Sequence, residues 1–512
     1  MIGFRVGAPP GRGQRERLAS LLTRTRTGEV VLALALGTAI IAALRMGLTV
    51  GVGPDRLLGF LLAGAAMVLL VKHPLLAIRV ALLVVPLSVV VLAQLLTWGV
   101  PPDIVRSGAI LKDAVVVAVV VAGLRARAAR GQPLASLDRA GLAYLAFAGL
   151  WWVLTPFIAL EPLTGDARLV ALRQMVLFPA MFLGVRWLAP TPAERHALVR
   201  WLVRAAAVIA LGGVYQRLDR QGFAERILLD IDIIRYYREV AGLSGRALGQ
   251  QVGWFSVEPP RVVSFLIAPF AFADVMLTAF AATVATVIQS RSRRLTLAAI
   301  GLFGVAVVWS GTRINMIALA VVLLTARFDR RGVSERTRVQ VVVVGMVALL
   351  AITPTVLSSR LLGEGTGDSN EGHRNELVTA AEKIVARPLG YGLGSDGAVQ
   401  RRYEVSSATA ETVSGNTVLA IGVQGGVLTM AAFVVFLLSV VRELKRRRRA
   451  DPHDALVQVA FLVLVGGLVA VSTHQGWLDL TSGTFVWIAI GLGLPEVAPA
   501  LVPGEDRSPV GA

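Results

Sequence analysis

The sequence has no cysteine and little charge, and both shortages restrict what the protein is. Without cysteine, no disulfide can hold its loops together and no cysteine-ligated zinc site can form, and the redox compartment is left undetermined. Charged residues make up 16% and hydrophobic residues 55% of the 512 residues, with a mean hydropathy of +0.68. A soluble domain carries about 25% charged residues. The apolar runs, of about 15 to 25 residues each, are as long as membrane-spanning helices rather than barrel strands. The composition therefore indicates a polytopic membrane protein.

The net charge of +18 is a feature shared with nucleic-acid-binding proteins. Here, however, the arginines collect in short loops between apolar runs, as in QSRSRR and RELKRRRRADPHD, which is the pattern of cytoplasmic loops. No soluble module remains to carry a basic groove, so we expect no nucleic-acid partner. The KRRRR run could also contact anionic membrane lipids or a regulatory protein.

The apolar runs predict an all-α fold, a transmembrane helical bundle of about 12–14 spans with a helix-containing extracytoplasmic loop. The expected spans lie near residues 30–48, 56–71, 76–97, 108–124, 139–158, 168–188, 197–214, 261–289, 295–310, 313–326, 338–357, 413–441, 455–473 and 478–493. The first span follows a basic segment, 1–29, and its length predicts an uncleaved anchor.

The loop charges predict the orientation of the chain. With the N-terminus in the cytoplasm, every strongly basic loop lies on the cytoplasmic side, and so does the tail 496–512. Two long loops, 215–260 and 358–412, then lie outside. The expected organisation is N-terminal transmembrane helices over 30–138 and a second transmembrane domain over 139–495.

The second outer loop contains a predicted amphipathic helix. Between His373 and Arg387, the apolar residues Leu377, Ala381, Ile384 and Val385 recur at helical spacing and form one stripe, and a proline follows. We expect this helix to lie at the membrane surface with its stripe against lipid or the bundle, or simply to close the loop.

The stretch PLGYGLGS follows this helix and alternates Gly390, Gly392 and Gly394. Glycine permits positive φ and close approach of a ligand, so these positions are candidates for substrate binding. A plain turn is the alternative. The stretch is not a P-loop, because no Gly-Lys-Ser/Thr follows.

Taken together, the motifs resemble those of the O-antigen ligase and polymerase superfamily. The similar segments are RVVSFLIAPFAFADVM with Arg261, WSGTRINMIALAVVLL with Arg313, R…E…AAEKIVARPLGYGLGS with Arg374, and GNTVLAIGVQGGVLTM with Asn416. Their order and spacing match over about residues 139–495. The ligase branch has a His-Asn pair where this chain has Gly415 and Asn416, and a final glycine where it has Thr429. This departure favours a polymerase-like or divergent transferase.

The resemblance implies an enzyme of cell-surface polysaccharide synthesis in the bacterial cytoplasmic membrane. Such proteins move a saccharide chain from a polyprenyl-pyrophosphate carrier to a glycan or lipid acceptor outside the cytoplasm. They work without a cofactor or metal, among membrane lipids and with a regulator of chain length as a further partner. The leaving pyrophosphate is a multiply charged anion, and arginines can neutralise it through bidentate hydrogen bonds. We expect Arg261, Arg313 and Arg374 to be catalytic, and Asn416 to bind substrate.

With glycine at position 415, the acceptor's general base is open. The outer candidates are two histidines and three acids: His373, His474, Glu258, Glu404 and Glu411.

Several charges fall within predicted spans or loops. Arg173 is expected to face the bundle interior, pairing with a carboxylate or with substrate. Lys112–Asp113 and Asp274 could mark an ion path or be satisfied by neighbouring helices. Asp230 and Asp232 have the spacing of a metal-binding Asp-x-Asp motif, but they also fit an amphipathic segment, and no metal site is expected.

A flippase or other transporter of lipid-linked oligosaccharides is the alternative function. Transport would favour two repeated halves and broken helices at mid-membrane, whereas the sequence has no evident repeat. An inactive scaffold of a cell-wall complex is a third reading.

Overall fold

The computed structural model describes residues 54–131, 133–158, 165–243, 248–249, 253–255, 261–287, 293–328, 366–396 and 415–496. These residues form helices, turns and loops, with no strand among them. Seven helices are long and apolar enough to cross a membrane: α3 (Pro74–Thr97), α4 (Pro102–Arg130), α5 (Ser136–Ile158), α6 (Gly165–Leu188), α7 (Pro192–Leu218), α11 (Pro269–Thr286) and α18 (Thr417–Ala450). The chain is therefore a multi-pass membrane protein with an all-helical fold, as the sequence predicts.

Five other helices also lie where the sequence predicts spans: α2 (Pro54–Lys72), α12 (Arg293–Trp309), α13 (Arg313–Phe328), α19 (Ala455–Ala470) and α20 (Leu480–Gly493). Each predicted span within the described residues coincides with one of these helices. The predicted spans 30–48 and 338–357, the segment 1–29 and the tail beyond residue 496 lie outside the described residues.

Local sequence signals set many of the helix ends. Proline occupies the first turn of α3, α4, α7 and α11, where its missing N–H costs no hydrogen bond. α7 also begins with a capping box, in which Thr191 and Glu194 satisfy each other's backbone N–H groups. Gly131 ends α4 in the left-handed conformation.

Several spans differ in their bounds from the sequence prediction, and two of the differences have a clear physical cause. The span expected from residue 261 becomes helical only at Pro269, because Ser264 and Ile267 adopt positive φ and break the segment before it. The span expected to end at residue 441 continues as α18 to Ala450. Arginine and lysine are good helix formers, so the basic run extends the helix beyond its apolar part.

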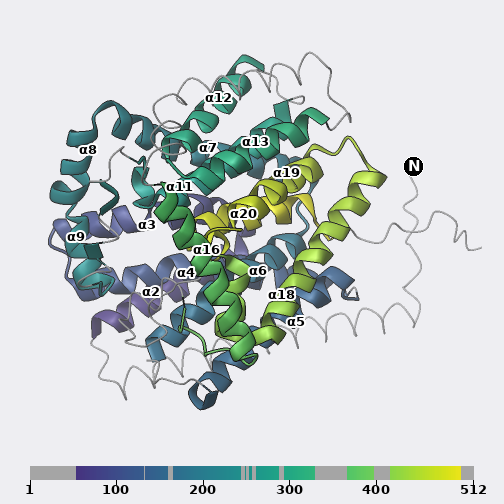
Figure 1. The fold of residues 1–512 in the computed structure, drawn as a ribbon, viewed down its shortest axis with the longest axis horizontal. Helices are drawn as coiled ribbons and strands as arrows, with labels where there is room; N and C mark the ends of the chain where they lie inside the picture. The colour runs from purple at the N-terminus through teal and green to yellow at the C-terminus, as the bar shows by residue number, and fades with distance from the viewer. Residues whose placement is uncertain are drawn as a thin grey trace, which may run out of the picture.

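The helices pack as one bundle around a continuous apolar core (Figure 1). Helix α11 contacts α12, α19 and α20. Helix α4 contacts α2, α3 and α6, and helix α5 contacts α18. The predicted outer loop 215–260 begins with short helical turns: α8 (Arg220–Glu225), η1 (Arg226–Asp230), α9 (Ile233–Arg235) and η2 (Tyr236–Val240). They enclose a small second core with the end of α3 and the start of α4.

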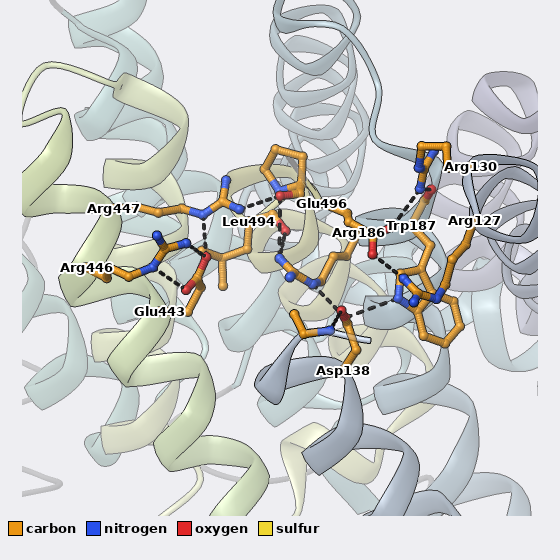
Figure 2. A network of polar contacts seen from close by, with 12 residues as sticks. Arg127, Arg130, Asp138, Arg186, Trp187, Glu443, Arg446, Arg447, Leu494 and Glu496 are labelled. Atoms are coloured by element: carbon orange, nitrogen blue, oxygen red, sulfur yellow. Dashed lines mark hydrogen bonds and ion pairs between the residues drawn. The ribbon is translucent and has the colours of Figure 1, made fainter. Parts of the chain in front are cut away.

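Buried ion pairs join several helices at one end of the bundle (Figure 2). Asp138 at the start of α5 accepts from Arg186 at the end of α6, at 2.8 Å, and from the indole of Trp187. Arg186 also donates to the carbonyl of Leu494 beyond α20. Glu496 pairs with arginines at the end of α4.

This network shows which helix ends share one side. The start of α5 and the ends of α4, α6 and α20 meet there. The end of α18 joins them, because Arg447 of α18 donates to the carbonyl of Pro495. The starts of α6, α18 and α20 are therefore at the opposite end. This grouping is the one expected from the loop charges.

Candidate functional site

The stretch from Pro388 to Gly394 fills a break in α18. At Gly426 the backbone has φ 72° and ψ 177°, which is not helical and which only glycine adopts readily. A break inside a membrane helix frees backbone groups that lipid cannot satisfy. The glycine stretch supplies the partners: the N–H groups of Tyr391 and Gly392 donate to the carbonyls of Val423 and Gln424, and the carbonyl of Pro388 accepts from Val427.

Side chains complete this contact. The amide oxygen of Gln424 accepts from the N–H of Gly394, and the hydroxyl of Thr155 accepts from the N–H of Leu393. The indole of Trp151 donates to the carbonyl of Leu389. α5 and α18 thus hold the glycine stretch from two sides.

The glycines predicted to bind substrate instead allow the backbone of this stretch to fit against α18. Gly390, Gly392 and Gly394 all have positive φ. A Cβ on Gly390 would lie 2.5 Å from the backbone nitrogen of Gly426, which leaves no room for a side chain. Each N–H from residue 390 to 395 donates to a protein acceptor. The N–H groups of residues 390 to 395 are therefore not left to hold a phosphate.

The predicted surface helix is present as α16 (Thr366–Ala386), which packs against the first turns of α18. Its predicted apolar stripe is wrong in part. Ala380 and Ile384 are buried against Val423, whereas Ala381 is exposed and Val385 is 80% exposed. The inward face is rotated because α16 packs on a glycine of α18, Gly422, which admits Ile384.

Arg261 and Arg313 come together at one turn. Arg261 precedes the irregular segment before α11, and Arg313 begins α13. The N–H of Val262 donates to the carbonyl of Trp309, and the Arg261 side chain packs on Gly311, its Cγ 3.2 Å from where a Cβ would be. The two predicted catalytic arginines therefore flank one glycine turn.

Gln216 of α7 holds the segment that carries Arg261. Its amide oxygen accepts from the N–H groups of Val263 and Ser264, at 2.9 Å each, and its amide nitrogen donates to the carbonyl of Arg261. Ser264 donates to the carbonyl of Ile209 and has a positive φ of 53°. Such a backbone persists only where its surroundings fix it.

A buried polar cluster lies at the same end of the bundle. Asn315, two residues beyond Arg313, donates to the carboxylate of Asp274 at 2.7 Å. The Nε2 of His474 is 3.0 and 3.1 Å from the two oxygens of that carboxylate. His474 follows α19, and Asp274 lies in the second turn of α11. Asp274 therefore has hydrogen-bond partners from neighbouring elements, which was one of the two alternatives left by the sequence.

The His474 ring is fully engaged, which bears on its predicted role as a base. Nδ1 bonds the carbonyl of Ala470, and Nε2 faces the Asp274 carboxylate. Burial lowers the pKa of His474, but the charge and hydrogen bond of Asp274, the Ala470 carbonyl and Asp479 together raise it above its usual value. Both ring nitrogens face protein acceptors, so neither is open to take a proton from a substrate.

We expect this pair to make stability depend on pH. Because the folded-state pKa of His474 is above the unfolded value of about 6.5, its contribution is fully present below that pH and is lost as pH rises through the folded pKa. The Tm difference between wild type and His474→Gln should be larger at about pH 6 than at about pH 9. Thermal unfolding in detergent at both pH values measures it, and a difference that grows with pH would contradict the ion pair.

Of the other predicted residues, Asn416 lies beside the loop that carries His474, because its neighbour Thr417 donates to the carbonyl of His474. Arg173 of α6 forms an ion pair with Asp113 of α4 at 3.0 Å, as one sequence alternative had it. Asn416 caps α18, accepting from two backbone N–H groups and donating to the carbonyl of Ser472. Arg374 is exposed on α16, and the side chain of its neighbour His373 lies outside the described residues.

The acids from the outer loops give no metal site among the described residues. Asp230 is exposed, 4.0 Å from Arg226, and Asp232 caps α9 by accepting from the N–H of Arg235. In the described ranges, no three His, Asp or Glu side chains group as metal ligands. Glu258, Glu404 and Glu411 lie outside these ranges.

Sequence reasoning missed Gln216, Asn315 and Gln424. All three are amides inside apolar spans, and each is buried. That signal is visible in the sequence, because a buried amide in a membrane helix requires a partner.

No protein-family model and no curated protein matches the chain.

Proposed function

We propose that the protein is a glycan polymerase or ligase that transfers a saccharide chain from a polyprenyl-pyrophosphate carrier to an acceptor hydroxyl on the extracytoplasmic side of the membrane. The observation that carries the proposal is the meeting of Arg261 and Arg313 at the Gly311 turn, beside the Asp274–His474–Asn315 cluster. The membrane-embedded bundle suits a donor whose tail stays in lipid.

The chemistry is a displacement at the sugar carbon that bears the pyrophosphate. The acceptor oxygen forms the new bond to this carbon as the bond to the pyrophosphate oxygen breaks, which inverts the donor sugar. The leaving group departs with the negative charge, and the hydroxyl proton leaves to a base. Arg261 and Arg313 are proposed to bind the pyrophosphate and stabilise its growing charge, which is the main catalytic contribution.

In this proposal the buried polar cluster of Asp274, Asn315 and His474 positions the arginines and does not itself react. Asp274, Asn315 and His474 link α11, α13 and the loop after α19, so they fix α13 where Arg313 begins it. Gln216 fixes the segment of Arg261 from α7. Both arginines are thereby presented from rigid supports, as a charge-stabilising site requires.

The test is complementation of a strain that lacks this protein. Arg261→Ala and Arg313→Ala are each expected to lower the formation of long surface polysaccharide by at least about a hundredfold, the typical effect of removing one charge-stabilising group. Arg226→Ala is the matched control, because Arg226 is exposed and pairs only loosely with Asp230. Polysaccharide length, membrane level and the leaflet of the lipid-linked units are measured for each strain.

Each result has a defined meaning. Well-expressed arginine variants that accumulate short lipid-linked units on the outer leaflet support the transferase. Units that accumulate on the inner leaflet identify a flippase instead. Wild-type polysaccharide in both arginine variants would overturn the proposal.

A further inference from the structure

α7 has one continuous exposed stripe. Its members recur every three or four residues, which places them on a single helix face: Arg200, Arg204, Val208, Leu211, Tyr215 and Leu218. α7 is one of the seven candidate spans, so its exposed apolar part faces lipid tails. The stripe is apolar from Val208 onward and changes to two arginines at its other end.

The depth of these arginines follows from helix geometry. At 1.5 Å per residue, Arg204 is about 21 Å and Arg200 about 27 Å from Leu218 along the axis. A hydrocarbon core is about 30 Å thick. With Leu218 at one boundary, Arg200 reaches the other, and Arg204 lies one turn inside it, where its long side chain extends to the phosphate level.

A third arginine joins them from α3. The indole of Trp201, between the two α7 arginines in sequence, donates to the carbonyl of Arg79 at 3.0 Å. Arg79 is therefore at the same depth, and its side chain is exposed. Tryptophan is typical of the membrane interface. Three cationic side chains thus surround one lipid-facing junction between two helices.

Within the described ranges, none of these three arginines forms an ion pair with a carboxylate. The acid nearest to them on α7, Glu194, is bonded to Thr191 at the helix start. An arginine left alone against lipid costs about 2.5 kcal/mol or more near the core. A phosphate supplies the bidentate acceptor that guanidinium groups prefer.

We propose that Arg79, Arg200, Arg204 and Trp201 form a binding site for the phosphate headgroup of an anionic phospholipid. The site lies at the end of the bundle that carries the buried network of Figure 2, since Arg195 near the start of α7 donates to the carbonyl of Leu492 at the end of α20. By the loop charges, this is the cytoplasmic leaflet, where anionic lipids and polybasic segments attract each other. The site is opposite the candidate catalytic end and is independent of the proposed function.

The test compares two triple variants of the full chain in detergent. Arg79→Gln, Arg200→Gln and Arg204→Gln together remove the site. Arg442→Gln, Lys445→Gln and Arg449→Gln remove three exposed charges from the end of α18 on the same side. Binding of cardiolipin, phosphatidylglycerol and phosphatidylcholine is measured by native mass spectrometry. Inorganic phosphate is tested in the same way, as a phosphate that has no acyl chains.

We expect wild type and the α18 variant to bind the two anionic lipids alike, and the site variant to bind them at least about tenfold more weakly, or 1.4 kcal/mol. Phosphatidylcholine and inorganic phosphate should bind weakly to all three proteins. Equal losses in both triple variants would show general charge attraction and overturn the site, as would unchanged binding by the site variant. Arg→Lys at the three positions keeps the charge, so a loss there too supports guanidinium recognition.

Discussion

Replacing Gly426 with alanine is expected to destabilise the folded protein by several kcal/mol, on the order of 3. Its φ of 72° with ψ of 177° is a glycine conformation, and an added Cβ would lie 2.6 Å from the carbonyl oxygen of Pro388. Neither the helix nor the glycine stretch can move away, because backbone hydrogen bonds join them on both sides of the break. Thermal unfolding in detergent, with the monodisperse fraction on size exclusion, measures the effect.

Two other glycines separate backbone strain from crowding. Gly99 has a φ of 85° but open space around it, so Gly99→Ala should cost about 1 kcal/mol from strain alone. Gly149, within α5, also has open space, and its replacement by alanine should be neutral or stabilising. A Tm of Gly426→Ala equal to that of Gly149→Ala would refute the broken-helix account.

Replacing Asp138 with alanine is expected to have the second large effect, about 3–5 kcal/mol of lost stability. The carboxylate is fully buried and the Arg186 side chain is 3% exposed, so the change leaves an uncompensated guanidinium in the bundle. The indole of Trp187 loses its acceptor as well. The same unfolding assay reads the change as a lower Tm.

An exposed carboxylate provides the control for Asp138→Ala, and removal of the buried Arg186 charge provides a rescue. Asp230→Ala removes a carboxylate from an exposed pair and should cost less than about 1 kcal/mol. Removing both partners, as in Asp138→Ala with Arg186→Met, should recover much of the loss, since no charge is then left buried. Asp138→Ala at the wild-type Tm would show that the network is not a stabilising contact.

The sequence predicted the spans because their cause is local. An apolar run of sufficient length must form a helix in lipid, whatever its neighbours are. Proline in the first turn and capping residues such as Thr191 fixed several helix starts in the same local way. The loop charges likewise predicted which helix ends share a side, and the buried network agrees with that grouping.

The predictions about the site were weaker because they depended on partners distant in sequence. Gly390 and its neighbours resembled a flexible binding turn, yet they complete a helix that begins after residue 415. His474 was a candidate general base, yet Asp274 and the Ala470 carbonyl occupy both of its nitrogens. The stripe of α16 was misplaced by the glycine on which the helix packs.

The sequence by itself thus determined the all-helical, membrane-spanning fold, since hydrophobic length and backbone hydrogen bonding within each helix decide it. Only the tertiary structure decided that Arg261 meets Arg313 at one turn and that Arg79 lies beside two arginines of α7. It also decided that the glycine stretch bonds the backbone groups left free by the break at Gly426. Such contacts are decided by the packing of side chains from different helices, and the spacing of residues along one helix does not encode which neighbour it meets.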